Sequence, residues 1–181
     1  MSFARAVGEL QSVAPRPEIA LEDAPAPTKL APYAFALGGT VTRDGEEVAT
    51  GRLILLHDPA GHDAWEGTLR LVTYVTAELE SEIAADPLLS AVAWSWLVDA
   101  LDAHDAGHRA AGGTVTLTVS TRFGDLAGPP TVADLEIRAS WTPEDDRLAA
   151  HMHAWCALLA STAGLPPPGV TALATRAAGA A

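Results

Sequence analysis

Two segments of the chain alternate strictly between apolar and polar side chains, and this alternation limits the fold more than any other feature. In residues 115–120 each apolar residue is followed by a hydroxyl-bearing one. In residues 134–141 the apolar residues alternate with Asp134, Glu136, Arg138 and Ser140. A period of two places one set of side chains on each face of a β-strand. A sheet with one polar face needs a cover on its other face only, which predicts an antiparallel sheet with helices on one side.

Three earlier segments also have strand character. The first begins at Tyr33, and the run Arg43-Asp44-Gly45-Glu46 that follows it predicts a tight hairpin, because Asp-Gly accepts the positive φ of a type I′ turn. The second covers about residues 48–56, and the third about residues 68–77. We therefore expect about five strands, with an open face that carries Thr116, Thr118, Glu136 and Arg138.

Helical patterns precede, divide and follow these strands. Ser2 predicts the N-cap of a first helix that stops before Pro15, and Asp86-Pro87 predicts the start of a second helix with a broad apolar stripe. The run Thr142-Pro143-Glu144-Asp145 predicts the start of a third helix, which ends at Gly164. The order is α-β-β-β-α-β-β-α, which predicts an α+β two-layer sandwich.

The ends and the first connection have a different composition. Five prolines between Pro15 and Pro32 remove backbone donors, so we expect this segment to run extended over the surface without a regular element. Residues 169–181, rich in Ala, Gly and Thr, have too little apolar mass to dock and are expected to be mobile. The prediction is one domain, residues 1–168, followed by a tail.

Charge and cysteine usage narrow the class of protein. Acidic residues outnumber basic ones 23 to 11, for a formal charge of -12, and such a surface repels phosphate backbones and anionic lipid. We therefore predict no nucleic-acid binding. We also predict no membrane association, since no apolar run approaches the roughly 20 residues that a membrane helix needs. The lone Cys156 and an N-terminus without an apolar signal region predict a cytoplasmic protein.

The segment from His57 to Trp65 gathers the most chemistry, with two imidazoles, two carboxylates and an indole. Its histidine spacing matches no zinc signature and it contains no thiolate, so we predict no metal and no cofactor. A turn at Asp58 with Trp65 packed over the sheet end explains the pattern structurally, and recognition of a ligand or partner explains it functionally. The candidate binding residues here are His57, Asp58, His62 and Trp65, with Arg70 beside them.

The other candidate features are weaker. His104 and His108 have the spacing of helical metal ligands, but Gly107 falls between them at the helix end, which favours an interaction with the helix dipole. Hydrolase, phosphate-loop and dinucleotide motifs are absent, so the sequence does not indicate an enzyme. Trp94 lies about 200° round the second helix from Trp96 and either covers the sheet edge or marks an interface.

Several motifs together resemble an uncharacterised actinobacterial family catalogued as domain of unknown function three thousand. They are Leu30-Ala31-Pro32-Tyr33, the run from Gly51 through His62 to Thr68, Asp86-Pro87-Leu88-Leu89 with Trp94-Ser95-Trp96-Leu97, the run from Glu136 to Pro143, and Ala163-Gly164-Leu165-Pro166-Pro167. The resemblance covers most of the chain and implies a cytoplasmic protein without an assigned activity. The order of elements is also similar to that of the type III secretion chaperone-like fold, whose members are small, acidic and commonly dimeric.

These features favour a non-enzymatic, chaperone-like interaction module. It would bind a protein partner or its own copy through the open sheet face or the helix that carries Trp94. The alternative is a small-molecule or metal-binding protein, including an enzyme, with its site at the segment from His57 to Trp65. The sequence identifies neither the partner nor the ligand.

Overall fold

A computed structural model describes residues 2–125 and 131–168. The elements follow in the order α1 (Phe3–Gln11), β1 (Ile19–Asp23), β2 (Tyr33–Arg43), β3 (Glu46–His62), the 3-10 turn η1 (Asp63–Trp65), β4 (Gly67–Leu79), α2 (Ser81–Ala84), α3 (Leu89–Ala103), β5 (His108–Thr121), β6 (Thr131–Pro143) and α4 (Leu148–Thr162). The predicted tail, residues 169–181, lies outside the described residues.

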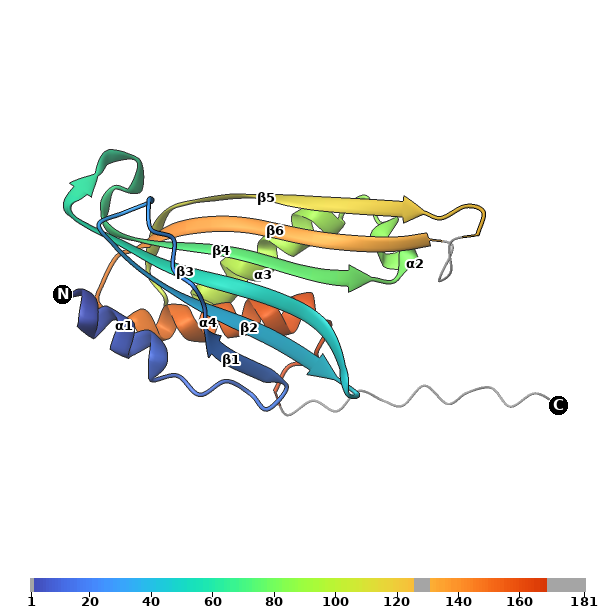
Figure 1. Ribbon diagram of the computed structural model, residues 1–181, viewed down its shortest axis with the longest axis horizontal. Helices are drawn as coiled ribbons and strands as arrows, with labels where there is room; N and C mark the ends of the chain where they lie inside the picture. Colours follow the sequence, from blue (N-terminus) through green and yellow to red (C-terminus); the bar gives the residue numbers. More distant parts are fainter. Residues whose placement is uncertain (1, 126–130, 169–181) are drawn as a thin grey trace.

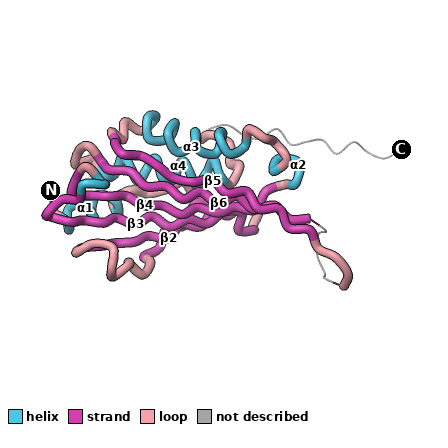
Figure 2. Tube along the Cα trace, turned by 90° about the horizontal axis from the view of Figure 1, so that it is seen from above, coloured by secondary structure: helices cyan, strands magenta, loops and turns pink. Residues whose placement is uncertain are grey.

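The strands form one antiparallel sheet in the order β1-β2-β3-β4-β6-β5, and the long helices α1, α3 and α4 cover one of its faces (Figures 1 and 2). The predicted α+β two-layer architecture is therefore confirmed, with six strands in place of about five. None of the described helices has the length and hydrophobicity that crossing a membrane requires. We call the uncovered side of the sheet the open face.

The prediction of an irregular segment between Pro15 and Pro32 is wrong for β1. The prolines at 17 and 25 flank this strand and leave its amides free to pair with β2, from Ile19 opposite Val41 to Asp23 opposite Leu37. Proline removes a donor only at its own position, so five residues between two prolines are enough for a short edge strand.

The predicted start of the third helix at Thr142 is also wrong. Thr142 and Pro143 are the last residues of β6, and α4 begins at Leu148. Proline is tolerated at the end of a strand as well as in the first turn of a helix, so the motif fits both structures. The N-cap residue is Arg147, which makes no side-chain cap hydrogen bond, and its backbone N–H donates at 2.9 Å to the Asp145 carboxylate in the turn before the helix.

Other local predictions are confirmed. Ser2 is the N-cap of α1, with its hydroxyl accepting the Arg5 amide, and Asp44 and Gly45 have φ values of 55° and 84° at the tip of the β2–β3 hairpin. Gly164, at φ 65°, follows the end of α4. The loop predicted for residues 57–66 is in part a strand, because β3 continues to His62 through an irregular register.

The side chain of Trp155 joins α4 to three strands. A Cβ atom on Gly39 would lie 2.9 Å from its ring, and one on Gly51 would lie 3.2 Å from it, so the glycines admit the indole at close approach. The indole N–H donates to the Thr73 hydroxyl at 2.8 Å, and this hydroxyl donates to the Arg52 carbonyl at 3.0 Å. The buried indole therefore has a satisfied polar group among β2, β3 and β4.

Trp94 packs against β5 in a similar way. It is half-buried, and a Cβ atom on Gly113 would lie 2.9 Å from its ring and against the backbone of β6 at Arg138 and Ala139. Trp94 therefore covers the sheet edge, which is one of the two roles that the sequence allows.

Gly113→Ala should destabilise the protein by about 1–3 kcal/mol, because its methyl group would force β5 away from Trp94 and from the backbone of β6. Urea unfolding measures this free energy. Gly112→Ala is the matched control, since no atom lies within 4 Å of a Cβ built there, and it should change stability little. Equal stability of the two variants would contradict the packing described.

A buried histidine lies under the sheet. His151 of α4 is fully buried, and its Nδ1 accepts the indole N–H of Trp141 at 3.1 Å. An Nδ1 that accepts a hydrogen bond carries no proton, so the ring is neutral in the folded protein. Burial lowers the pKa of His151 to about 4.

Acid should weaken the fold through this residue. The unfolded chain takes up a proton at His151 below its ordinary pKa of about 6.5, whereas the folded chain resists it until about pH 4, so this stability is complete above pH 6.5 and lost as the pH falls to 4. Between pH 7 and pH 5 the loss should be about 2 kcal/mol. Urea unfolding at both pH values measures it. His151→Gln should remove most of the difference, because His104, whose pKa burial also lowers, contributes the rest, whereas His153→Gln, at an exposed position, should retain the His151 contribution.

Candidate functional site

The register of the sheet places open-face residues in rows that cross β3, β4, β6 and β5. In that order the three central rows are Leu56, Arg70, Thr142 and Arg109; Ile54, Val72, Ser140 and Gly112; and Arg52, Tyr74, Arg138 and Thr114. The middle row is apolar or small, whereas both neighbouring rows contain arginines. Each row combines residues up to 86 positions apart in sequence, as Arg52 and Arg138 are.

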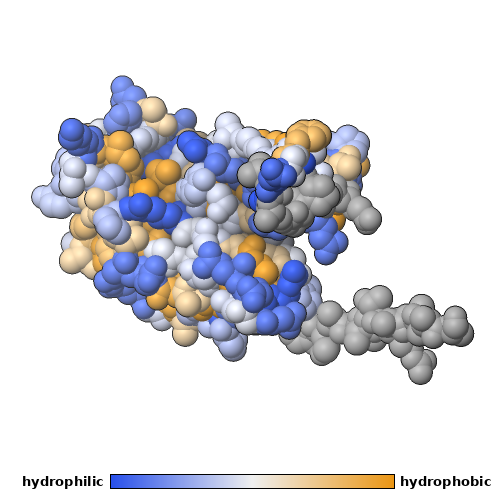
Figure 3. Space-filling view, turned by 45° about the vertical axis from the view of Figure 1, so that its right-hand side comes forward, coloured by the Kyte–Doolittle hydropathy of each residue, from blue (hydrophilic) through white to orange (hydrophobic). Residues whose placement is uncertain are grey.

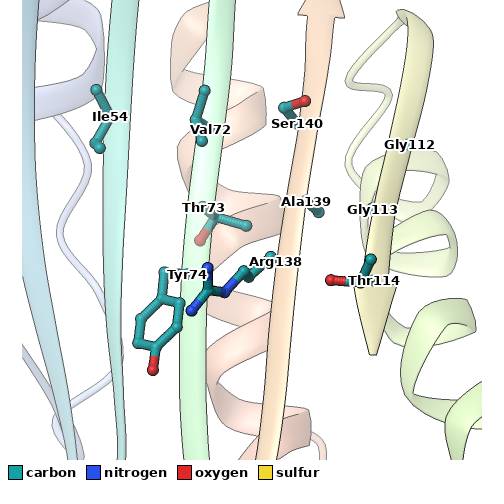
Figure 4. Close-up of a pocket in the computed structure, with 10 residues that line it drawn as sticks. All are labelled: Ile54, Val72, Thr73, Tyr74, Gly112, Gly113, Thr114, Arg138, Ala139 and Ser140. Carbon is teal, nitrogen blue, oxygen red and sulfur yellow. The ribbon is translucent and has the colours of Figure 1, made fainter. Parts of the chain in front are cut away.

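A shallow groove of about 510 Å³ follows the middle row (Figure 4). Ile54, Val72 and Ser140 line it together with Gly112 and Gly113, and Tyr74 and Arg138 stand at one side. In the space-filling view of Figure 3, exposed hydrophobic residues lie in separate small patches between hydrophilic ones. The lining residues make the groove a local apolar strip with Arg138 at its border.

Tyr74, Glu136 and Arg138 form a hydrogen-bonded cluster at this border. The Tyr74 hydroxyl donates to Glu136 at 2.8 Å, the Arg138 Nε–H donates to the same carboxylate at 2.6 Å, and the guanidinium lies 5.1 Å from the centre of the Tyr74 ring. Hydrogen bonds from Arg138 and then Tyr74 lower the pKa of Glu136, and the bond to Glu136 raises the pKa of Tyr74. The cluster holds Arg138 beside the groove.

Arg70 lies at the other border and is only 9% exposed. Its guanidinium donates to the Thr142 hydroxyl at 3.0 Å and to the Ser140 hydroxyl at 2.8 Å. Burial lowers the pKa of Arg70, and the negative charge of Glu66 opposes this shift. Neutral hydroxyls rather than a carboxylate therefore make the hydrogen bonds observed for this cation.

The segment predicted as a binding loop divides into two parts. His62 stacks on Trp65 with ring centres 4.9 Å apart, and the Trp65 carbonyl accepts the Thr142 hydroxyl. His57 instead packs between Phe3 and Tyr33 at ring distances of 6.0 and 5.7 Å. The structure therefore brings His62 and Trp65 together but not His57 and His62.

The other candidate binding residues of this region, Asp58 and Arg70, make hydrogen bonds within the fold. The Asp58 carboxylate accepts the Ala60 amide at 3.0 Å, which is the turn that the sequence indicates. Among the residues that the structure describes, no group of three or more histidine, cysteine, aspartate or glutamate side chains is placed to hold a metal ion. Arg70 approaches the segment through Thr142 and the Trp65 carbonyl.

A second cavity, of about 400 Å³, lies beside α4 and is lined in part by His104, His153 and Cys156. The two imidazoles stack with centres 5.7 Å apart. Burial raises the pKa of Cys156 to about 12, so its thiol stays protonated at neutral pH and is a poor nucleophile. This cavity does not provide thiolate chemistry.

Sequence reasoning identified Glu136, Arg138 and Ser140 as open-face residues but did not single out Arg52, Tyr74 or Gly112 as neighbours of a site. Their alternation along β3 and β4 is a detectable signal for one face of the sheet. Their meeting in rows depends on the pairing of β4 with β6, which the order of elements along the chain does not specify.

Thr142→Val should loosen residues 58–66, because it removes the acceptor for Arg70 and the donor to the Trp65 carbonyl. We expect a stability loss of about 1–3 kcal/mol and faster amide exchange in that segment, measured by hydrogen–deuterium exchange. Thr76→Val removes the Thr50–Thr76 hydroxyl contact on the same face and is the control. Equal exchange in both variants would contradict a clamping role for Thr142.

Comparison with known proteins gives a family but no activity. No curated protein and no solved structure matches the chain. The profile of the family described as protein of unknown function (DUF3000) matches residues 1–171, a range that includes every helix and strand that the structure describes. This family description assigns no role to any residue of the groove or of the segment from His57 to Trp65. The chain belongs to the DUF3000 family.

Proposed function

We propose that the protein is a non-enzymatic interaction module in which two copies associate through the free edge of β5. The observation that supports this proposal is the composition of that edge. From Ala110 to Thr121 the strand contains twelve residues without a charge or a proline. A long edge strand without such residues is a template for pairing with another strand.

The pattern of β5 suits pairing with itself. Val115 and Leu117 pack against the core on the helix side, Val119 follows on the same face of the strand, and Thr116 and Thr118 lie on the open face. An antiparallel pair centred on Leu117 would place Val115 opposite Val119 of the second copy. Apolar side chains would then meet apolar ones and hydroxyls would meet hydroxyls, as favourable cross-strand pairs require.

The exposure of Val119 and the charge of the chain also favour a second copy of the chain as the partner of β5. Val119 is 58% exposed in the single chain, although it is a β-branched residue inside a strand. Each copy carries a formal charge of -12, so two copies repel at most contacts, but the uncharged stretch of β5 adds no local repulsion. The two sheets would join into one, with the open faces on the same side.

Val119→Asp should weaken the dimer roughly tenfold or more, because a carboxylate would lose water beside Val115 of the second copy. Sedimentation velocity over a concentration series measures the dissociation constant. Val92→Asp on α3, where the native side chain is 43% exposed, introduces the same charge away from β5 and should leave the dimer intact.

Two results would contradict the proposal. One is a wild-type protein that stays monomeric at millimolar concentration, and the other is a dimer that tolerates Val119→Asp as well as Val92→Asp. Circular dichroism of each variant establishes that it is folded before its association is compared.

A further inference from the structure

We propose that the groove on the open face binds a small organic anion that has an apolar body, with the anionic group held at the arginine borders. This inference is independent of dimer formation through β5, since it rests on the face of the sheet and not on its edge. The floor of the groove supports the apolar body of the ligand, and the arginines and hydrogen-bond donors at its borders support the anionic group.

The floor of the groove selects an apolar body. Ile54 and Val72 are direct neighbours across β3 and β4, and both are only partly buried. Gly112 ends the same row on β5, and the space above it is free for a ligand because no atom lies within 4 Å of a Cβ built there. With strands roughly 4.8 Å apart, the row from β3 to β5 spans about 14 Å, the length of an aromatic ring with a short chain.

The borders select a negative charge. The rows on either side of the groove contain Arg52, Arg70, Arg109 and Arg138. Two carboxylates lie nearby, since Glu22 of β1 continues the Arg52 row beyond Gly38 and Glu136 of the next row accepts from Arg138. Four of the 11 basic residues of a chain with a net charge of -12 thus lie around one small groove. These four arginines outnumber the carboxylates Glu22 and Glu136 beside them, which favours an anion at this place.

Arg138 is the arginine among the residues that line the groove. Arg138 has a side chain that is 64% exposed, and its Nε–H bond to Glu136 fixes it at the rim of the groove. Arg52 lies in the same row as Arg138, beyond Tyr74. A guanidinium presents five N–H donors in a planar fork, and a carboxylate can accept two of them together.

Ser140 connects Arg70 to the groove. The serine hydroxyl lines the groove and accepts an N–H of Arg70 at 2.8 Å, so its own proton remains available for donation. A hydroxyl that accepts from a cation is a stronger donor in turn, because the two hydrogen bonds polarise each other. A ligand carboxylate above Ser140 would therefore receive a hydrogen bond without displacing the Arg70 contacts.

Isothermal titration calorimetry with 4-phenylbutyrate tests this proposal, and 4-phenylbutanamide is the matched neutral probe. We expect the acid to bind with a millimolar or tighter dissociation constant and the amide roughly tenfold more weakly, since hydrogen bonds to charged groups are the stronger ones. Added salt should weaken the acid more than the amide. Equal affinity for the two probes, or no binding of the acid at millimolar concentration, would overturn the proposal.

Variants locate the site. Arg138→Gln should weaken binding of the acid roughly tenfold and leave the amide unchanged, and Arg52→Gln should act in the same direction. Arg147→Gln is the control, because Arg147 is equally exposed at 61% and paired with Asp145 just before α4, outside the sheet. Retention of full affinity by both Arg138→Gln and Arg52→Gln would overturn the assignment of the anion to these borders.

Discussion

The close approach of α4 to the sheet at Trp155 is the contact on which the two-layer arrangement depends. Glycine at positions 39 and 51 lets the indole and Leu159 reach the strand backbone, where a side chain on either glycine would collide with them. The Thr73 hydroxyl then accepts the indole N–H inside an otherwise apolar layer. A buried aromatic ring contributes several kcal/mol, and this one fixes the helix over β2, β3 and β4 at once. Because α1 and α3 both pack on α4, the whole helix layer is positioned by the same contact.

The polar and charged residues of the sheet lie on the face opposite the helices. Since the helices cover only one face, the outward residues of β3, β4 and β6 remain free to form the arginine-bordered groove. The edge strand β5 remains free for a different reason, because the chain provides no strand beyond it in the described residues. The two proposed binding surfaces thus arise from one topology, in which a face and an edge of the same sheet are left uncovered.

Local chemistry in the sequence predicts much of this fold. The period of two near residues 115–120 and 134–141, the Asp44-Gly45 turn and the Ser2 cap are short-range signals, and the structure contains each of them. The errors occur where one residue type suits two structures. Pro143 fits the end of a strand and the first turn of a helix. In the structure it ends β6, where the hydroxyl of the preceding Thr142 is hydrogen-bonded to Arg70 and to the Trp65 carbonyl. The groove could not be predicted, because the rows of Arg52, Arg70 and Arg138 exist only once β4 pairs with β6.

The contact between Thr142 and the Trp65 carbonyl also has a consequence for synthesis of the chain. Its two residues are 77 positions apart, so the segment that ends at Trp65 leaves the ribosome well before the strand that holds it. At ordinary rates of translation this interval is about 4 to 15 s, far longer than a hairpin needs to form. The β2–β3 hairpin can therefore form early, whereas the Trp65 carbonyl lacks its hydrogen bond from Thr142 until β6 joins the sheet. The docking of β6 is then the event that adds the Thr142 contact to the segment after β3.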